Sequence, residues 1–174
     1  MTPEHAIKGF GGAVLFSHVP EKTMDVLVSK LGLEQVGEEN GLLRLQASGD
    51  IGQIIDIQST GIQRGIGGAG TVHHIAWRAK DYAEHEQIQQ DLEQSGYHPT
   101  PVIDRQYFNA VYFREPGGIL FELATDPPGF ARDEPAESMG EKLMLPEWYE
   151  PQREQIEQLL PRIEVREWKG ESKS

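Results

Sequence analysis

The sequence predicts an α+β fold in which two βαβββ modules form a curved, partly open mixed sheet, with helices on the convex face and a C-terminal arm. Three observations lead to this prediction. The order strand, helix, strand, strand, strand occurs twice at similar length. Each copy ends on a glycine-led apolar strand that carries one acid, Gly52–Asp56 in the first and Gly118–Glu122 in the second. After Thr125 the composition turns to proline and acidic residues. We expect a first module at 1–59, a linker at 60–71, a second module at 72–126 and the arm at 127–174.

The first module begins with a lead-in at 1–8 and a buried strand at 11–17. Pro20 begins a helix whose apolar residues recur on one face, and Gly32 ends it. Further strands are expected near 34–37, 41–47 and 53–58. Glycine-rich residues 60–70 follow. They indicate a flexible linker, with a phosphate-binding loop as the weaker alternative because the Lys-Ser/Thr ending is absent.

The second module repeats this order. A strand is expected at 72–78, and a helix at Tyr82–Ser95 turns Ile88 and Leu92 inward and ends at Gly96. Strands near 98–102, 108–114 and 119–124 complete the module. In the arm, residues 151–160 suggest a short helix. We expect the arm to pack on the sheet or on a partner, and the alternative is a lid anchored by Trp148 and Tyr149.

Composition excludes several classes of function. The 174-residue chain is 37% hydrophobic and carries a net charge of −12, which disfavours binding to nucleic acid or to an anionic membrane. It has no cysteine, so disulfides, thiolate metal sites and a cysteine nucleophile are excluded. It also lacks a membrane-spanning apolar run and a signal-peptide pattern, and we expect a cytoplasmic location. A bound metal would need histidine and carboxylate ligands, which suit Fe(II), Mn(II) or Zn(II).

The two strands at 72–78 and 119–124 carry a candidate metal site. Side chains alternate along a strand, so His74 and Glu122 lie on the faces opposite the large apolar residues. One histidine and one carboxylate in a common cup are two of the three ligands of a facial two-His-one-carboxylate site. The alternative is a structural histidine and an edge charge. The first module has Gly12 in place of His74 and keeps only Asp56.

Residues between these strands suggest catalytic roles. Tyr112 lies on the strand at 108–114 and faces the pocket if that strand pairs with the one carrying Glu122. Its phenol could donate a hydrogen bond to dioxygen or to a substrate oxygen. Arg105 could hold a phenolate or carboxylate, or could pair with a surface acid. His73 faces the opposite way in an ideal strand and is expected to support the site, although a bulge would exchange the two histidines.

The repeated modules and these motifs resemble the vicinal oxygen chelate (glyoxalase) superfamily, and more closely its hydroquinone-specific, extradiol-type ring-cleaving dioxygenases. The resemblance is carried by GTVHHIAWR at 70–78, DRQYFN at 104–109, YFREPGGILFE at 112–122, ATDPPGF at 124–130 and GEKLMLP at 140–146. It implies Fe(II), or sometimes Mn(II), held by His74 and Glu122. It also implies that Tyr112 and Arg105 assist an aromatic diol and dioxygen during cleavage beside a hydroxylated ring carbon.

The chain departs from that family in its length and in its set of metal ligands. Members run to about twice this length, and the chain matches their C-terminal half. Their third ligand, a histidine near the N-terminus, has no counterpart, because His5, His18, His85 and His98 are expected in a lead-in, a turn, a helix surface and a strand start. Three interpretations follow: a separate N-terminal half completes the site, a second copy completes it as a homodimer, or the chain is a non-catalytic metal- or small-ligand-binding module.

Overall fold

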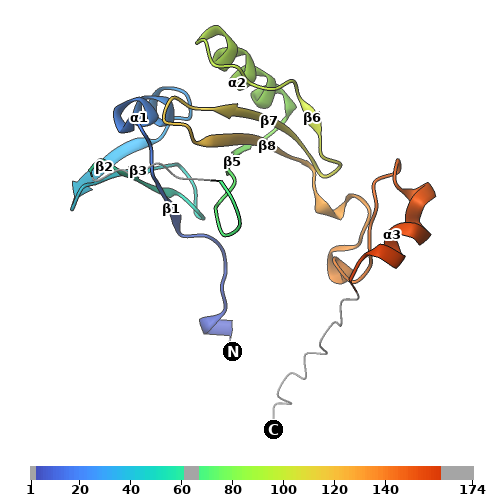
Figure 1. The fold of residues 1–174 in the computed structure, drawn as a ribbon. Coiled ribbons are helices and arrows are strands. Elements are labelled where there is room, and N and C mark those ends of the chain that lie inside the picture. Colours follow the sequence, from blue (N-terminus) through green and yellow to red (C-terminus); the bar gives the residue numbers. More distant parts are fainter. Residues whose placement is uncertain (1–2, 61–66, 162–174) are drawn as a thin grey trace. The chain divides into compact units, whose positions relative to one another are not determined.

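The computed structural model describes residues 3–60 and 67–161 (Figure 1). The chain divides into two units, Met1–Arg132 and Asp133–Ser174. Unit 1 contains both predicted modules, preceded by a short 3₁₀ helix η1 (Pro3–His5). The linker predicted at 60–71 lies in part, at 61–66, outside the described residues.

The first module forms a four-stranded sheet with one helix. Its elements are β1 (Gly12–Leu15), α1 (Pro20–Ser29), β2 (Glu34–Glu39), β3 (Leu42–Gln46) and β4 (Ile54–Gln58). The strand order is β1-β4-β3-β2, in which β1 is parallel to β4 and the other pairs are antiparallel. A parallel first pair requires a long crossover between β1 and β4, and α1 with the β2–β3 hairpin supplies it.

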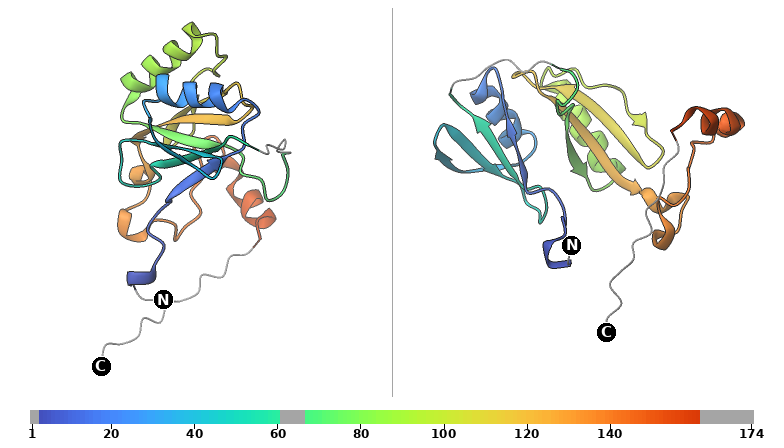
Figure 2. Two further views of the ribbon diagram at one scale, coloured as in Figure 1. Left: turned by 90° about the vertical axis from the view of Figure 1, so that its left-hand side faces the viewer. Right: turned by 60° about the horizontal axis from the view of Figure 1, so that its bottom comes forward.

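The second module repeats this arrangement. Its elements are β5 (Ile75–Ala79), α2 (Tyr82–Gln94), β6 (Ile103–Asp104), β7 (Phe108–Arg114) and β8 (Leu120–Pro128), with η2 (Phe130–Arg132) after them. The strand order β5-β8-β7-β6 matches that of the first module (Figure 2). The predicted α+β fold with two βαβββ modules is therefore confirmed, and the strands form two open sheets of four.

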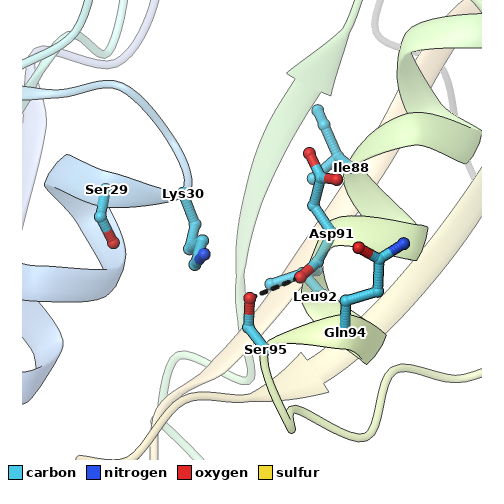
Figure 3. A pocket seen from close by; sticks show the side chains of 7 residues that line it. All are labelled: Ser29, Lys30, Ile88, Asp91, Leu92, Gln94 and Ser95. Atoms are coloured by element: carbon cyan, nitrogen blue, oxygen red, sulfur yellow. Dashed lines mark hydrogen bonds between the residues drawn. The ribbon is translucent and has the colours of Figure 1, made fainter.

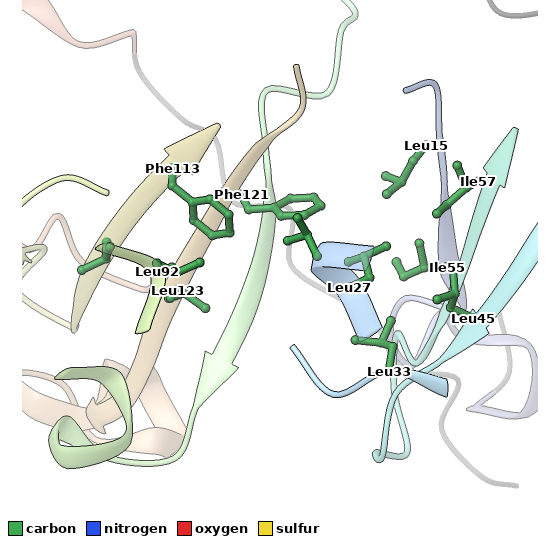
Figure 4. Close-up of a cluster of buried hydrophobic side chains, with 12 residues drawn as sticks. Leu15, Leu27, Leu33, Leu45, Ile55, Ile57, Leu92, Phe113, Phe121 and Leu123 are labelled. Carbon is green, nitrogen blue, oxygen red and sulfur yellow. The ribbon is translucent and has the colours of Figure 1, made fainter. Parts of the chain in front are cut away.

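One hydrophobic core serves both modules (Figure 4). Its buried members alternate along the strands and are joined by residues from the two helices: Leu15, Val26, Leu27, Leu33, Leu45, Ile55, Ile57, Leu92, Val111, Phe113, Phe121 and Leu123. Because these residues occupy one face of each sheet, their immediate neighbours along the strands must point to the other face. That alternation places Asp56 and Glu122 opposite the core.

A buried polar cluster also joins the modules. Glu115, between β7 and β8, accepts hydrogen bonds from Thr23 Oγ1 of α1 (2.6 Å) and from the backbone N–H groups of Gly117 and Ile119 (both 2.8 Å). Ser17 Oγ lies 2.6 Å from Thr23 Oγ1, and Glu115 is only 2% exposed. A buried carboxylate is tolerated where several donors replace its water, and this cluster meets that condition.

Two strand predictions in the second module were wrong in their bounds. The strand expected at 72–78 begins only at Ile75, so His73 and His74 precede it. The strand expected near 98–102 is absent, and β6 is confined to Ile103–Asp104. Pro99 and Pro101 explain the latter difference, since proline cannot donate to a strand ladder.

Unit 2 contains only short helices in its described part. These are η3 (Ala136–Ser138), η4 (Glu150–Gln152) and α3 (Arg153–Leu159), the last of which lies within the segment predicted to be helical. Arg153 of α3 pairs with Glu150 of η4 and with Glu157 of α3, and it donates to the carbonyl of Leu143. None of the residues at 133–161 is buried within the chain. In the described parts of both units, no helix is long and apolar enough to cross a membrane.

Candidate active site

Glu122 lies at the centre of the candidate site because three strands meet there. On β8 it pairs with Ala76 of the parallel strand β5 and with Tyr112 of the antiparallel strand β7. Its chain neighbours Phe121 and Leu123 are in the core, so its side chain points to the opposite face of the sheet. That side chain is only 4% exposed, because the neighbouring site residues cover it.

His74 approaches Glu122 from the residue just before β5. Its Nε2 atom lies 2.6 Å from Glu122 Oε2, and its side chain is 33% exposed. The predicted convergence of these two groups is therefore present in the structure. His74 lies at the boundary between the sheet and solvent, where a small molecule could reach it, whereas Glu122 is covered.

Tyr112 and Arg105 extend this cluster. Tyr112 Oη donates a hydrogen bond to Glu122 Oε1 at 2.9 Å and accepts one from Arg105 Nη2 at 3.1 Å. Burial raises the pKa of the Tyr112 phenol; the hydrogen bond from Arg105 lowers it and the one to Glu122 raises it. The hydrogen bond to Tyr112 is the main cause of the raised pKa of the Arg105 guanidinium. At neutral pH the site thus holds a protonated phenol between a cation and a carboxylate.

His73 does not point away from the site, as an ideal strand would predict. Its Nδ1 atom lies 2.9 Å from Nδ1 of His74, and the two rings meet edge to face. The alternation rule fails here because both histidines precede the strand. A contact between two Nδ1 atoms requires one to be protonated and the other to accept. His73 is therefore placed to control which nitrogen of His74 carries its proton.

The first module carries a closed counterpart of this site. Asp56 on β4 pairs with Arg44 on β3, in the register that joins Glu122 to Tyr112 in the second module. Arg44 donates two hydrogen bonds to Asp56, both of 2.8 Å, and these lower the pKa of the Asp56 carboxyl. A Cβ atom at Gly12 would collide with the carbonyl oxygen of Ile54. No side chain fits where His74 would be expected, so this copy cannot offer the same pair of ligands.

His74 and Glu122 have the donor atoms and nearly the spacing that a divalent metal ion requires. Cis ligands about 2.1 Å from an octahedral ion lie about 3.0 Å apart. His74 Nε2 and Glu122 Oε2, at 2.6 Å, would need to separate by only a few tenths of an ångström. Within residues 3–60 and 67–161, however, no group of three histidine, cysteine or acidic residues could hold a metal ion. The described residues therefore fit two of the three ligand positions.

One histidine was placed wrongly by the sequence prediction. His85 was expected on the surface of its helix but is 1% exposed, and its Nε2 lies 2.9 Å from the carbonyl oxygen of Leu123. His85, Ile88 and Leu92 are at positions i, i+3 and i+7 of α2, so His85 lies on the same inward face as the other two. That spacing was the available signal. His85 supports β8 from the core side, behind the site.

Two hollows on the surface of unit 1 differ in their relation to this site. A small groove of about 200 Å³ between α1 and α2 (Figure 3) includes the core residue Leu92, so it lies on the helical side of the sheets. Its bond from Ser95 Oγ to the Asp91 carbonyl caps the end of α2. A mostly apolar hollow of about 470 Å³ instead borders Tyr112, together with Leu120, Pro116 and Thr100 among others. Only this second hollow shares a residue with the candidate site.

Comparison with known proteins agrees with this architecture. Residues 9–123 match the model of the Glyoxalase/Bleomycin resistance protein/Dioxygenase superfamily. The chain is 60% identical over 167 residues to a Bacillus subtilis protein named "Putative ring-cleaving dioxygenase MhqO", covering 96% of this chain and 54% of that protein. It is also 37% identical over 81 residues to a chlorohydroquinone/hydroquinone 1,2-dioxygenase of Sphingobium indicum, covering 45% of this chain and 24% of that protein.

A crystal structure extends the comparison to three dimensions. The crystal structure of a protein named "putative dioxygenase" from Bacillus subtilis superposes on this chain with a TM-score of 0.92 and 60% sequence identity. The match covers 95% of this chain and 54% of that one. The chain thus spans about half the length of these Bacillus relatives, as the resemblance to a C-terminal half predicted. The family match and the repeated modules lead to one conclusion: the chain belongs to the Glyoxalase/Bleomycin resistance protein/Dioxygenase superfamily.

Proposed function

We propose that this chain carries most of the active site of a metal-dependent, extradiol-type dioxygenase that cleaves hydroquinone-type rings. The observation that carries the proposal is the continuous contact from His74 through Glu122 and Tyr112 to Arg105. It joins a pair of metal ligands to a proton donor and a fixed cation. Similarity to proteins named as ring-cleaving and hydroquinone dioxygenases supports the same chemistry.

Each side chain of the site would have a role that follows from its chemistry. His74 and Glu122 would hold the ion, Fe(II) by preference and Mn(II) or Zn(II) as alternatives. A redox-active ion supplies electron transfer between the aromatic diol and dioxygen when it is bound. Arg105 would orient a phenolate oxygen by its charge, and Tyr112 would donate its phenolic proton to a substrate or dioxygen oxygen. The apolar hollow beside Tyr112 offers space next to the polar cluster for a flat ring.

His73 has a supporting part in this scheme. When His74 Nε2 faces a metal ion, its Nδ1 must carry the proton. His73 Nδ1, at 2.9 Å, is then placed to accept that hydrogen bond. Such an outer partner fixes the tautomer and ring orientation of a ligating histidine.

The third ligand must come from outside the described residues, and we propose that a separate N-terminal half or a second copy of the chain supplies it. The chain spans 54% of the relative it matches at 60% identity. Solvent also reaches Val14 on β1 of the first module, which is 48% exposed, and Phe16 just after that strand, which is 54% exposed. Apolar residues on an uncovered sheet face favour association. Light scattering that shows only monomer at micromolar concentration would count against the second copy.

Oxygen uptake tests the enzymatic proposal. The protein is loaded with Fe(II) without air and then mixed with chlorohydroquinone and aerated buffer. A complete site consumes oxygen and yields a ring-opened product. His74→Ala should abolish both metal occupancy and uptake, whereas Tyr112→Phe should keep the metal and slow the uptake. The assay is repeated at protein concentrations on both sides of any dimerisation midpoint.

The same assay separates the second candidate function, a non-catalytic module that binds a metal or a small ligand. The absence of a three-donor cluster among the described residues favours this alternative. Metal binding that depends on His74 but gives no oxygen uptake, in monomer and dimer alike and also when a separate N-terminal half is supplied, would support it. Oxygen uptake that requires both His74 and Tyr112 would exclude it.

A further inference from the structure

The turn that carries Arg105 differs from its counterpart in the first module. Between β2 and β3 the chain turns through Asn40-Gly41, with φ of 52° and 77°, which lie between the paired residues Glu39 and Leu42. This is the compact Asn-Gly hairpin, which needs no outside support. Between β6 and β7 the turn is longer, running from Asp104 to its partner Asn109. The extra length places Arg105 beside the site.

The backbone of this longer turn is strained at one residue. Gln106 has a φ of 69° and, with Asn40, is one of two non-glycine residues at positive φ in the described chain. Glutamine lacks the short side chain that lets asparagine tolerate this region, so the conformation is strained. It persists only if surrounding contacts hold it.

Contacts from both ends hold this turn. Asp104 Oδ1 accepts a hydrogen bond of 2.7 Å from the Gln106 N–H, and Arg132 Nη1 donates one of 2.6 Å to the Gln106 carbonyl. The ring of Tyr107 stacks on Phe130, with centroids 5.0 Å apart. The Gly129 N–H donates to the Tyr107 carbonyl at 2.9 Å. Residues 129–132, just after β8, therefore contact the turn at Gln106 and Tyr107, in addition to the contact that Asp104 makes.

We propose that Arg132 is a positioning residue that, through the Gln106 carbonyl, holds the turn so that Arg105 reaches the Tyr112 hydroxyl. The guanidinium of Arg105 lies over the Tyr112 ring, 5.4 Å from its centroid, and donates to its oxygen. A cation on a long, exposed side chain keeps such a geometry only if its backbone is held. The consequence for substrate binding rests on the proposed function, but the positioning itself does not.

The Nε–Hε signal of Arg105 in ¹⁵N NMR spectra tests this proposal without metal or substrate. The signal is assigned by its loss in Arg105→Lys. Arg132→Gln should move it to the position of a free arginine, while the backbone spectrum stays folded. Arg114→Gln is the matched control, because Arg114 Nη1 also donates to a carbonyl, that of Gly118 at 3.0 Å, at the other end of β7. It should leave the Arg105 signal in place.

A second substitution separates positioning from general stability. Glycine adopts positive φ without strain, so Gln106→Gly should restore the Arg105 signal in the Arg132→Gln background. If Arg132→Gln does not fold, Arg132→Lys replaces it, and a partial shift is expected. An Arg105 signal unchanged in a folded Arg132 variant, or one that Gln106→Gly does not restore, would overturn the inference. Failed oxygen uptake by the dimer and by the chain supplied with a separate N-terminal half, with these NMR results intact, would refute the proposed function alone.

Discussion

The buried cluster around Glu115 gives a sharp prediction for Gly117→Ala. A Cβ atom on Gly117 would lie 2.5 Å from Thr23 Oγ1 and 2.8 Å from Glu115 Oε1, and closer still to Ser17 Oγ. Distances below 3.0 Å are not found for real Cβ contacts, so these side chains must move apart. They are the atoms that join α1 to the β7–β8 turn.

The expected cost follows from what must be displaced. Forcing a methyl group into a packed site costs about 1–3 kcal/mol, and losing one buried hydrogen bond to a charged group costs about 1.5–3 kcal/mol. Because the backbone of Gly117 is not at positive φ, no strain term is added. A loss near 3 kcal/mol in the free energy of unfolding is therefore expected, using the lower half of each range.

Gly49→Ala is the matched control for this measurement. Gly49 lies in the corresponding turn of the first module, and a Cβ atom there would meet nothing within 4 Å. It should be neutral, or stabilising by up to about 1 kcal/mol through the unfolded state. Urea unfolding followed by circular dichroism measures both variants, and a slope near 2 kcal/mol/M converts the loss into a midpoint shift of about 1.5 M. Equal midpoints for the two alanine variants would refute the role assigned to the cluster.

Three further predictions concern the two carboxylate sites. His74→Ala should weaken Fe(II) or Mn(II) binding about 100-fold or more, as measured by calorimetry. Losing a ligand should reduce metal affinity at least as much as losing a residue that hydrogen-bonds to a ligand. Unchanged affinity would show that the metal binds elsewhere. Tyr112→Phe should keep the metal affinity within about tenfold and slow ring cleavage about 100-fold, the usual share of a proton donor; an unchanged rate would remove that role. Arg44→Gln should lower stability at neutral pH. The Asp56 pKa is lowered mainly by its hydrogen bonds from Arg44, so the stabilisation is present above the unfolded pKa and is lost as pH falls through the folded one. The two proteins should converge in acid, and a stability difference that persists there would contradict this explanation.

Sequence reasoning succeeded where one physical signal dominated. The strand at 108–114 was predicted with the bounds that β7 has, because it is a short run rich in aromatic and β-branched residues. Alternation also placed Tyr112 beside Glu122 through the pairing of neighbouring strands. It failed for His73, because the rule applies only inside a strand and β5 begins two residues later.

Contacts between distant residues were beyond the reach of sequence periodicity. Thr23 meets Glu115 across 92 positions, and Arg132 meets Gln106 across 26. Neither pair belongs to a repeating pattern, and each contact joins segments that are far apart in the sequence. Local propensity therefore identified the strands that carry the site, whereas the residues that hold those strands and turns in place required the structure.

The difference between the two modules explains why we assign the proposed chemistry to only one of them. Both present a carboxylate at the same register of the fourth strand, and both pair it with a side chain of the preceding strand. Arg44 satisfies Asp56 with two hydrogen bonds and leaves a closed ion pair. Tyr112 gives Glu122 only one, so the second carboxylate oxygen remains available to His74. The Tyr112 hydroxyl that contacts Glu122 is also neutral, whereas the Arg44 group that contacts Asp56 is a cation. A metal ion near Glu122 would therefore not be repelled by the group that is hydrogen-bonded to it. In the first module, arginine at this register forms a structural ion pair with the carboxylate. In the second module, tyrosine at the same register and a histidine just before the first strand form the site at which we propose that a metal ion binds.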